Sequence, residues 1–339
     1  MPTMSRYSLI QEGPILSKIE QGLEHAVTSR GLTWRDRGQS TKKQKYLDLI
    51  INHYTPEGEE PAVTRSWFLF GKSTPAAPSG HGAFENSRIS DEFPVENLRQ
   101  ASKLEIADVV GSIEHPELNE NNWTANTYDF LEEYYTHHAP PEYRDAYLAN
   151  LELRRMLEEV QEEIQSQRVG QAMSEHDPGS DNGSAPLDYY EDLGQASSKL
   201  LMAVANKDDL DPARDLVREF SMLSIKFAKG ISSIGRGDIE ESHQDCAESM
   251  AELYTEYIWK YIASHMSMAS AEGPKSDRLA EFAENNIDEI DKEIERQFEA
   301  RRRLFKENGL IPDVSEYPVR DDDANRALTG HLRSVKGAE

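Results

Sequence analysis

Residues 212–234, PARDLVREFSMLSIKFAKGISSI, contain the clearest structural signal in this sequence of 339 residues. Their apolar side chains recur every three or four positions, which is the spacing of one buried face of an α-helix. Asp211 directly precedes the stretch and Pro212 begins it, and a carboxylate followed by proline is typical of a helix start. The stretch therefore predicts a long amphipathic helix that packs against other helices. Its apolar face comprises Leu216, Phe220, Leu223, Phe227, Ile231 and Ile234.

Further helices are predicted on both sides of this one. Apolar residues at helical spacing mark 193–204, 239–257 and 279–305, and Gly273-Pro274 separates the last two. Because short loops join these helices, we predict that residues 187–311 form a C-terminal domain, an antiparallel four-helix bundle. Residues 312–339 are polar and acidic and are predicted to form a loose tail.

The N-terminal residues 1–168 predict a second, mostly helical domain. Thr64–Phe70, TRSWFLF, is its best strand candidate, because aromatic residues and threonine favour strands. A few helices with one short β-hairpin suit a winged-helix-like unit. Residues 169–186 are predicted to be a flexible linker, since 174–186, SEHDPGSDNGSAP, contain almost nothing that could be buried. Helical periodicity in this domain recurs after Pro14 and over 43–54, 95–113, 124–137 and 141–167.

Composition narrows the class of protein. Acidic residues outnumber basic ones 62 to 37, which gives a formal charge of −25, favours solubility and disfavours general binding of nucleic acid. This balance is similar to that of proteins from salt-loving cells, and an ordinary acidic protein is the alternative. The one cysteine, Cys246, excludes an internal disulfide. No apolar run approaches the roughly 20 residues of a membrane span, so we expect a cytoplasmic protein without a membrane partner.

One stretch resembles a known family. Lys45–Tyr54 (KYLDLIINHY), followed by Ser66–Gly71 (SWFLFG) and Pro75, is similar to the start of the Panacea (SocA-like) antitoxin domain. In that family an aromatic residue precedes Gly-Pro, whereas Lys72 stands at the proline position here. The similarity covers residues 45–75, about a tenth of the chain. It implies a protein–protein role, in toxin neutralisation or as a proteolytic adaptor, and carries over no catalytic residue.

A basic segment interrupts the acidic chain. Between residues 30 and 45 six basic residues accompany a single acid, Asp36. Such local positive charge can contact phosphate, so a regulator that contacts nucleic acid is an alternative function. Docking against the protein's own acidic surface, or against an acidic partner, is the other interpretation. The six basic residues are Arg30, Arg35, Arg37, Lys42, Lys43 and Lys45.

Glu240 and His243 form the best metal-binding fragment. Their spacing on a predicted bundle helix is that of one half of a di-iron carboxylate site, but the chain has no second Glu-x-x-His pair. A metal-dependent helical-bundle enzyme therefore stands as an alternative to a packed core histidine. Gly71-Lys72-Ser73 lacks the upstream glycine of a phosphate-binding loop, because Ser66 occupies that position. We predict no catalytic residues and no cofactor.

Aromatic residues give the candidate partner-binding positions, because Tyr and Trp are enriched at protein interfaces. Burial by neighbouring helices is the alternative for each of them. The candidates are Trp67, Phe70, Tyr257, Trp259 and Tyr261. Long amphipathic helices without a catalytic constellation favour a non-enzymatic protein that binds another protein, antitoxin-like or adaptor-like. The sequence assigns no oligomeric state.

Overall fold

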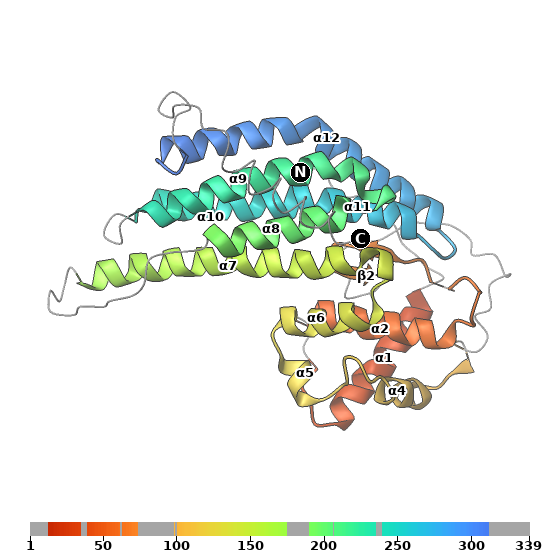
Figure 1. The fold of residues 1–339 in the computed structure, drawn as a ribbon. Helices are drawn as coiled ribbons and strands as arrows, with labels where there is room; N and C mark the ends of the chain where they lie inside the picture. The colour runs from red at the N-terminus through yellow and green to blue at the C-terminus, as the bar shows by residue number, and fades with distance from the viewer. Residues whose placement is uncertain are drawn as a thin grey trace, which may run out of the picture.

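The computed structural model describes residues 13–34, 39–61, 63–73, 98, 100–174, 190–205, 207–234 and 239–311. They form two groups of helices, one below the other in Figure 1, with a short β-hairpin where the groups meet. The fold is mainly helical with one small antiparallel hairpin, which confirms the predicted class.

The lower group is built on α1. Its apolar residues Leu16, Ile19 and Leu23 are buried, as their spacing predicts. α1 packs against α2 and α4, and α2 also packs against α6. α4 begins with a capping box, in which Ser102 and Glu105 each accept a hydrogen bond from the other's backbone amide. The group comprises α1 (Gly13–Ser29), α2 (Ser40–Tyr54), α4 (Lys103–Gly111), α5 (Glu120–Thr124) and α6 (Thr127–His138).

The upper group is larger. It comprises α7 (Pro141–Ser174), α8 (Tyr190–Ala205), α9 (Arg214–Ser233), α10 (Glu241–Leu253), α11 (Trp259–Ser270) and α12 (Ser276–Glu307). α8 packs on α7 and α9, and α12 packs on α10 and α11. The helix predicted over 212–234 is confirmed as α9, preceded by the 3₁₀ turn η1 (Asp208–Ala213) that contains Pro212. The π-helical turn η3 (Tyr254–Ile258) joins α10 to α11.

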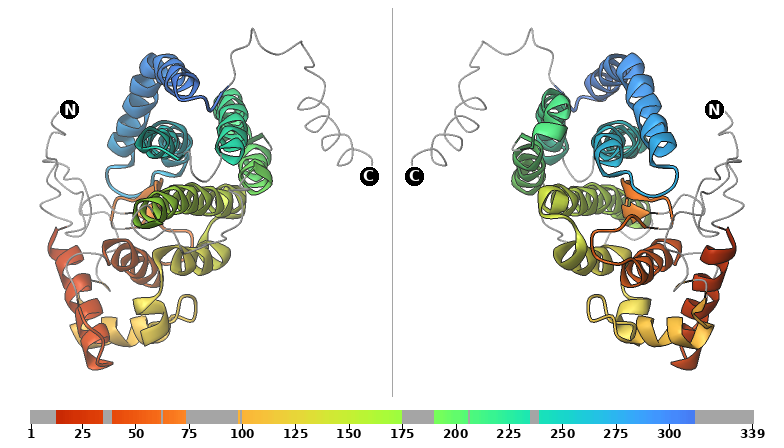
Figure 2. Two further views of the ribbon diagram at one scale, coloured as in Figure 1. Left: turned by 90° about the vertical axis from the view of Figure 1, so that its left-hand side faces the viewer. Right: turned by 90° about the vertical axis from the view of Figure 1, so that its right-hand side faces the viewer.

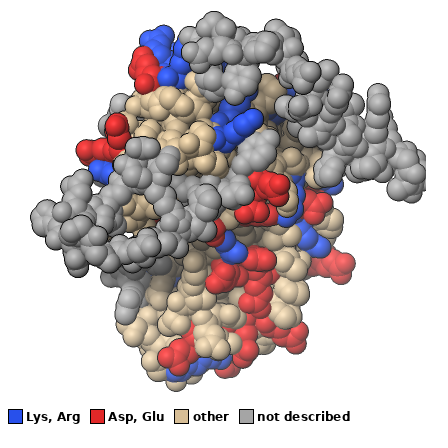
Figure 3. All heavy atoms as spheres, turned by 60° about the vertical axis from the view of Figure 1, so that its left-hand side comes forward, with Lys and Arg blue, Asp and Glu red and all other residues tan. Residues whose placement is uncertain are grey.

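These helices are amphipathic, and their outer faces are charged. In α12, Leu279, Ala283 and Ile290 are buried on one side, while acidic and basic residues occupy the other. Figure 3 shows both kinds of charge interspersed over one face of the molecule. None of the helices in the described part of the chain combines the length and the apolar composition that a membrane crossing requires.

α7 contacts both helix groups. The sequence analysis assigned residues 141–167 to the N-terminal domain, and α7 contacts α6 as far as Arg155 and Glu158, but it also packs along α8 and α10 (Figures 1 and 2). It also continues to Ser174, through the first part of the predicted linker. Residues 175–189 and 312–339, which include the rest of that linker and the predicted tail, lie outside the described residues. The predicted domain limits stay a prediction.

The β-hairpin connects the two groups. Its strands are β1 (Ser66–Phe68) and β2 (Gly71–Ser73), within and just after the predicted strand 64–70. β1 packs on α11 of the upper group, whereas β2 packs on α2 of the lower group. Arg65 and Glu272 also exchange two backbone hydrogen bonds of 3.0 Å. A continuous cluster of buried apolar residues extends from Ile15 to Leu310, so both groups share one core.

Candidate functional site

A buried ionic cluster holds the start of the hairpin. The Arg65 guanidinium donates from Nη1 to Asp48 Oδ1 of α2 at 2.8 Å and from Nε to Glu272 Oε1 at 2.6 Å. Tyr134 of α6 donates its hydroxyl to the second Asp48 oxygen at 2.9 Å. The Arg65 and Asp48 side chains are only 4% and 3% exposed, so water does not solvate either charge and each depends on the other for compensation. The cluster thereby connects α2, α6, the hairpin and the segment before α12.

The other end of the hairpin is held by two lysines. Lys72 of β2 forms an ion pair with Glu272 at 2.6 Å, and its carbonyl accepts a hydrogen bond of 2.7 Å from the buried Lys45 amine. Burial lowers the pKa of Lys45 to about 7, and the nearby Asp48 carboxylate only partly offsets this effect. β2 is therefore attached to α2 through a group that titrates near neutral pH.

Hydrogen bonds to α11 and α7 fix the rest of the hairpin. Ser270 Oγ accepts from the Trp67 amide at 2.9 Å, and the Ser66 and Ser267 hydroxyls lie 2.8 Å apart. The carbonyls of Phe68 and Leu69 accept hydrogen bonds from the Tyr147 hydroxyl and the Trp259 indole at 2.6 and 2.7 Å. With so many backbone groups engaged, the turn has a fixed position.

The turn presents Phe70 at the surface. Phe68 pairs with Gly71 across the strands, which leaves Leu69 and Phe70 as a two-residue turn. Gly71 has a φ of +88°, a conformation that favours glycine, and a Cβ there would lie 2.8 Å from the Tyr135 ring. The Phe70 side chain is 40% exposed, which makes it one of the few large exposed apolar groups among the described residues.

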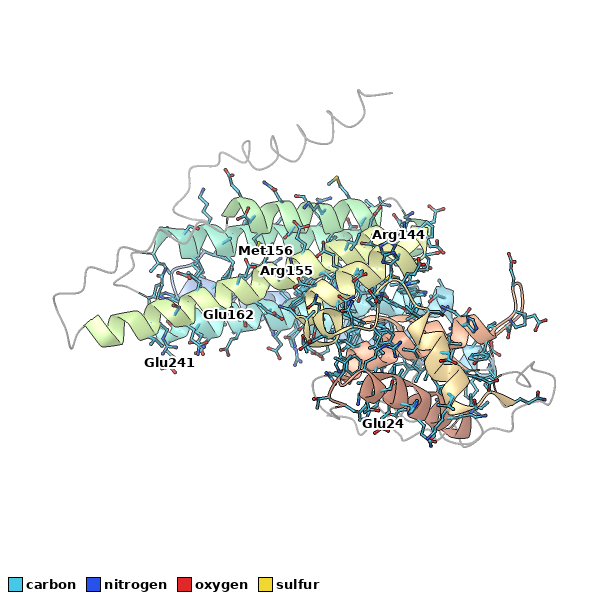
Figure 4. All side chains as sticks on the ribbon, turned by 90° about the horizontal axis from the view of Figure 1, so that it is seen from below. Glu24, Arg144, Arg155, Met156, Glu162 and Glu241 are labelled. Carbon is cyan, nitrogen blue, oxygen red and sulfur yellow. The ribbon has the colours of Figure 1, made fainter. Side chains whose placement is uncertain are left out.

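Arg154 of α7 lies beneath this phenyl ring. Its guanidinium carbon is 4.8 Å from the ring centroid of Phe70, within the range of a cation–π contact. Within the described part of the chain no carboxylate forms an ion pair with Arg154, and its Nε is buried without a hydrogen-bond partner. The next residue, Arg155 (labelled in Figure 4), pairs instead with Asp129 and Glu132 of α6. The exposed Phe70 and the half-buried Arg154 beneath it form a small patch of aromatic and cationic character, called the hairpin patch below.

The predicted partner-binding residues fall into two sets. Phe70 is exposed and Tyr257 is half-buried, so both side chains reach the surface. Trp67, Trp259 and Tyr261 are buried, which corrects the expectation that they form a surface. The Trp67 and Trp259 rings both contact Tyr147 of α7, and the Trp259 indole donates a hydrogen bond to the turn. The Tyr261 ring lies against His265 of α11.

The basic segment does not form the surface that its charge suggested. Lys42, Lys43 and Lys45 of α2 are buried, which corrects their proposed contact with phosphate. Lys42 donates to the carbonyls of Asn122, Trp123 and Ala125 at 2.7–3.0 Å, at the C-terminal end of α5, where carbonyls lack helical partners.

The neighbours of Lys42 along the chain are also engaged internally. The Lys43 amine lies 3.6 Å from the ring centroid of Trp34. Arg30 donates to the Ala26 carbonyl at 3.0 Å. Arg35 and Arg37 lie outside the described residues. Of the described basic residues, the three lysines therefore serve internal packing, whereas Arg30 is exposed.

Glu240 and His243 also have a structural role. Glu240 is the N-cap of α10, and its backbone amide donates to His243 Nδ1 at 3.0 Å in a reciprocal cap. The sequence analysis placed both residues within a helix over 239–257, and the start of α10 at Glu241 corrects that prediction for Glu240. Among the described residues, no group of three or more His, Cys, Asp and Glu side chains is arranged to hold a metal ion.

Sequence reasoning missed most of the site. Arg65 is 207 residues from Glu272, so no local pattern could join them. Asp48 gave a usable signal, because a carboxylate inside the apolar run of KYLDLII must find a buried partner. Arg154 gave none, since it lies among other charged residues of a helix.

Comparison with known proteins gives a family. A family model described as "Domain of unknown function (DUF8098)" matches residues 4–115 and 97–334. No curated protein and no solved structure matches the chain. Because the matched residues span nearly the whole sequence, the chain belongs to the DUF8098 family.

Proposed function

For this member of the DUF8098 family, we propose a non-enzymatic role in which the hairpin patch binds another protein. One observation carries the proposal: an exposed phenylalanine stands on a fixed turn and covers an arginine that lacks an ion pair. Aromatic residues and arginine dominate the binding energy of protein interfaces. A rigid hairpin also keeps the entropy cost of binding low.

The charge of the chain indicates which chemical groups the partner presents. In a protein with 62 acidic residues, an arginine without a carboxylate partner is available to a carboxylate of another molecule. We propose that the partner places an apolar side chain against Phe70 and an acidic group beside Arg154. Tyr257, the other predicted partner residue that reaches the surface, is proposed as a further contact.

Further parts of the sequence-based hypothesis belong to this proposal. The resemblance of residues 45–75 to the antitoxin domain supports an antitoxin-like or adaptor-like role in the cytoplasm, because the hairpin lies within that stretch. The short hairpin suits a winged-helix-like N-terminal unit. The pairs α8–α9 and α10–α12, with α7 packed against α8 and α10, are proposed to correspond to the predicted four-helix bundle with α7 as an added helix.

The test is affinity purification from native cells at their own salt concentration, with wild type, Phe70→Ala and Leu104→Ala. Leu104 is 55% exposed on α4 and is the matched control for loss of an exposed apolar side chain. Wild type and Leu104→Ala should retain a stoichiometric protein partner. Phe70→Ala should weaken binding of that partner by about 30-fold or more, as expected for a binding hot spot. Equal recovery with all three proteins, or no partner with any, would contradict the proposal.

A further inference from the structure

α12 is a long helix at the edge of the molecule. It has 32 residues, which corresponds to about 48 Å, and its buried side packs on α10 and α11. Figures 1 and 2 show it along the outer margin of the upper group, with its opposite side directed away from the other described helices. This outer side is nearly free of apolar residues, so charge decides what it can contact.

Charge on α12 is divided between its two halves. Over 277–291 the exposed side chains are mostly acidic, with Arg278 as the one basic residue. Over 292–307 the exposed basic residues outnumber the exposed acids, which are Glu295, Glu299 and Glu307. The acidic residues of the first half are Asp277, Glu281, Glu284, Asp288, Glu289 and Asp291, and the exposed basic residues of the second are Lys292, Arg296, Arg302, Arg303 and Lys306.

We infer that the outer face of α12 binds a second copy of this chain, antiparallel to itself. A helix with an acidic and a basic half is complementary to its own reversed copy, so two-fold symmetry forms every ion pair twice. A two-fold axis beside Glu293 and Ile294 places Arg303 opposite Glu284, Arg296 opposite Asp291, and Lys306 opposite Glu281. Within one chain Arg296 is ion-paired with Glu293 and Asp291 is hydrogen-bonded to Tyr261, so the contact between Arg296 and Asp291 exchanges these partners. In the same register Glu299 faces Asp288, which is the one like-charge contact along this line.

The net charge of each chain sets the conditions for this dimer. Two chains of charge −25 repel each other at long range. At about 0.15 M salt the screening length is about 8 Å, so repulsion across the molecule is suppressed while groups in contact still attract. The dimer is therefore expected to be weak and to require moderate salt. Its surface is separate from the hairpin patch, and it does not rest on the proposed function.

A charge exchange tests the inference. In the variant Arg296→Glu/Arg303→Glu both halves of α12 are acidic, and in Glu284→Lys/Asp291→Lys the two positions of the first half that face Arg303 and Arg296 become basic. Each variant alone should raise the dimer dissociation constant about tenfold or more, measured by sedimentation at about 0.15 M salt. An equimolar mixture should restore a heterodimer of wild-type affinity, because both contact regions are again complementary.

Matched controls separate this contact from net charge. Lys226→Glu/Lys229→Glu on α9 and Glu162→Lys/Glu191→Lys on α7 and α8 change the net charge equally at exposed positions outside α12. They should leave the dimer within about twofold of wild type. Glu299→Lys removes the like-charge contact and should tighten the dimer.

The contradicting results are equally clear. A wild-type chain that stays monomeric at all concentrations would overturn the inference. So would a dimer unaffected by either α12 variant, or two disrupted variants whose mixture stays monomeric. Circular dichroism checks that each variant is folded; if one is not, Arg303→Glu and Glu284→Lys alone replace the double variants in the same mixing test.

Discussion

Lys42, Lys43 and Lys45 lie within one turn of α2, and each amine has a different internal partner: helix-end carbonyls, an indole ring and a strand carbonyl. The carbonyls that bind Lys42 are 80 to 83 residues further along the chain. From the sequence the three residues predict a basic surface, because no nearby residue indicates that the hydrogen-bond acceptors lie so far along the chain. Lys45 is the most constrained, since its side chain is fully buried and burial lowers its pKa to about 7.

Lys45 predicts a stability that rises with pH. Between about pH 7.5 and pH 9 the unfolded chain keeps this amine protonated while the folded chain loses the proton. The unfolded state then binds more protons, so the free energy of unfolding should increase by about 2 kcal/mol across this range. Below pH 7 both states are protonated and the full cost of burying the charge remains.

The measurement is urea unfolding at both pH values for wild type and Lys45→Met. The range ends at about pH 9 because burial raises the pKa of Cys246 and of buried tyrosines such as Tyr134, and those groups reduce stability at higher pH. Lys45→Met should lose most of the increase. The same pH dependence in both proteins would assign it to other groups.

At the scale of elements, α9 and α12 follow their predicted periodicity, and the end of α12 lies on α9. After α12 ends at Glu307, the backbone of Leu310 crosses α9 at Gly230. A Cβ at Gly230 would overlap the Leu310 carbonyl, whereas a Cβ at Gly194 of α8 would lie 3.8 Å from Ile225, an ordinary contact. Gly230 is therefore sterically required in its helix, whereas Gly194 of the neighbouring helix is not.

This contrast predicts opposite effects of alanine. Gly230→Ala should lower the free energy of unfolding by about 1–3 kcal/mol, because backbone atoms must move to admit the methyl group. Gly194→Ala should raise it by about 0.5–1 kcal/mol through helix propensity alone. Thermal and urea unfolding of the two variants provide the comparison. A Gly230→Ala protein as stable as Gly194→Ala would show that the crossing at Leu310 is not tight.

At the scale of the whole molecule, the two helix groups are coupled. They share one continuous apolar core, and the cluster of Asp48, Arg65 and Glu272 connects α2 to the segment before α12. Removing one partner of a buried ion pair leaves the other charge uncompensated. Substitution of Asp48 in the lower group should therefore reduce the stability of the upper group as well.

Hydrogen exchange tests this coupling. Asp48→Asn should reduce stability by about 3 kcal/mol and accelerate exchange in α11 as well as in α2. The control is Glu152→Gln, which removes an ion pair to Lys199 whose side chains are 41% and 52% exposed and should cost less than about 1 kcal/mol. Faster exchange confined to the lower group would show that the groups unfold independently.

The sequence by itself determined the mainly helical class and the approximate positions of α1, α2, α6, α7, α9 and α12, with the hairpin near 64–70. These features depend on periodicity and on local start signals such as Pro141, which act within a few residues of chain. The N-cap of α10 shows the limit of such signals, since Asp238 and Glu240 are both suitable caps and the helix begins after Glu240.

Only the tertiary structure decided which charged and aromatic residues are exposed. Trp67 and Trp259 are buried, Phe70 is exposed, and Arg154 lies beneath Phe70 without an ion pair. The same residue types could occupy either setting, because burial depends on partners brought together from distant parts of the chain. The hairpin patch and its buried clamp consist of contacts that exist only after α2, α6, α7 and α11 have packed around residues 65–73.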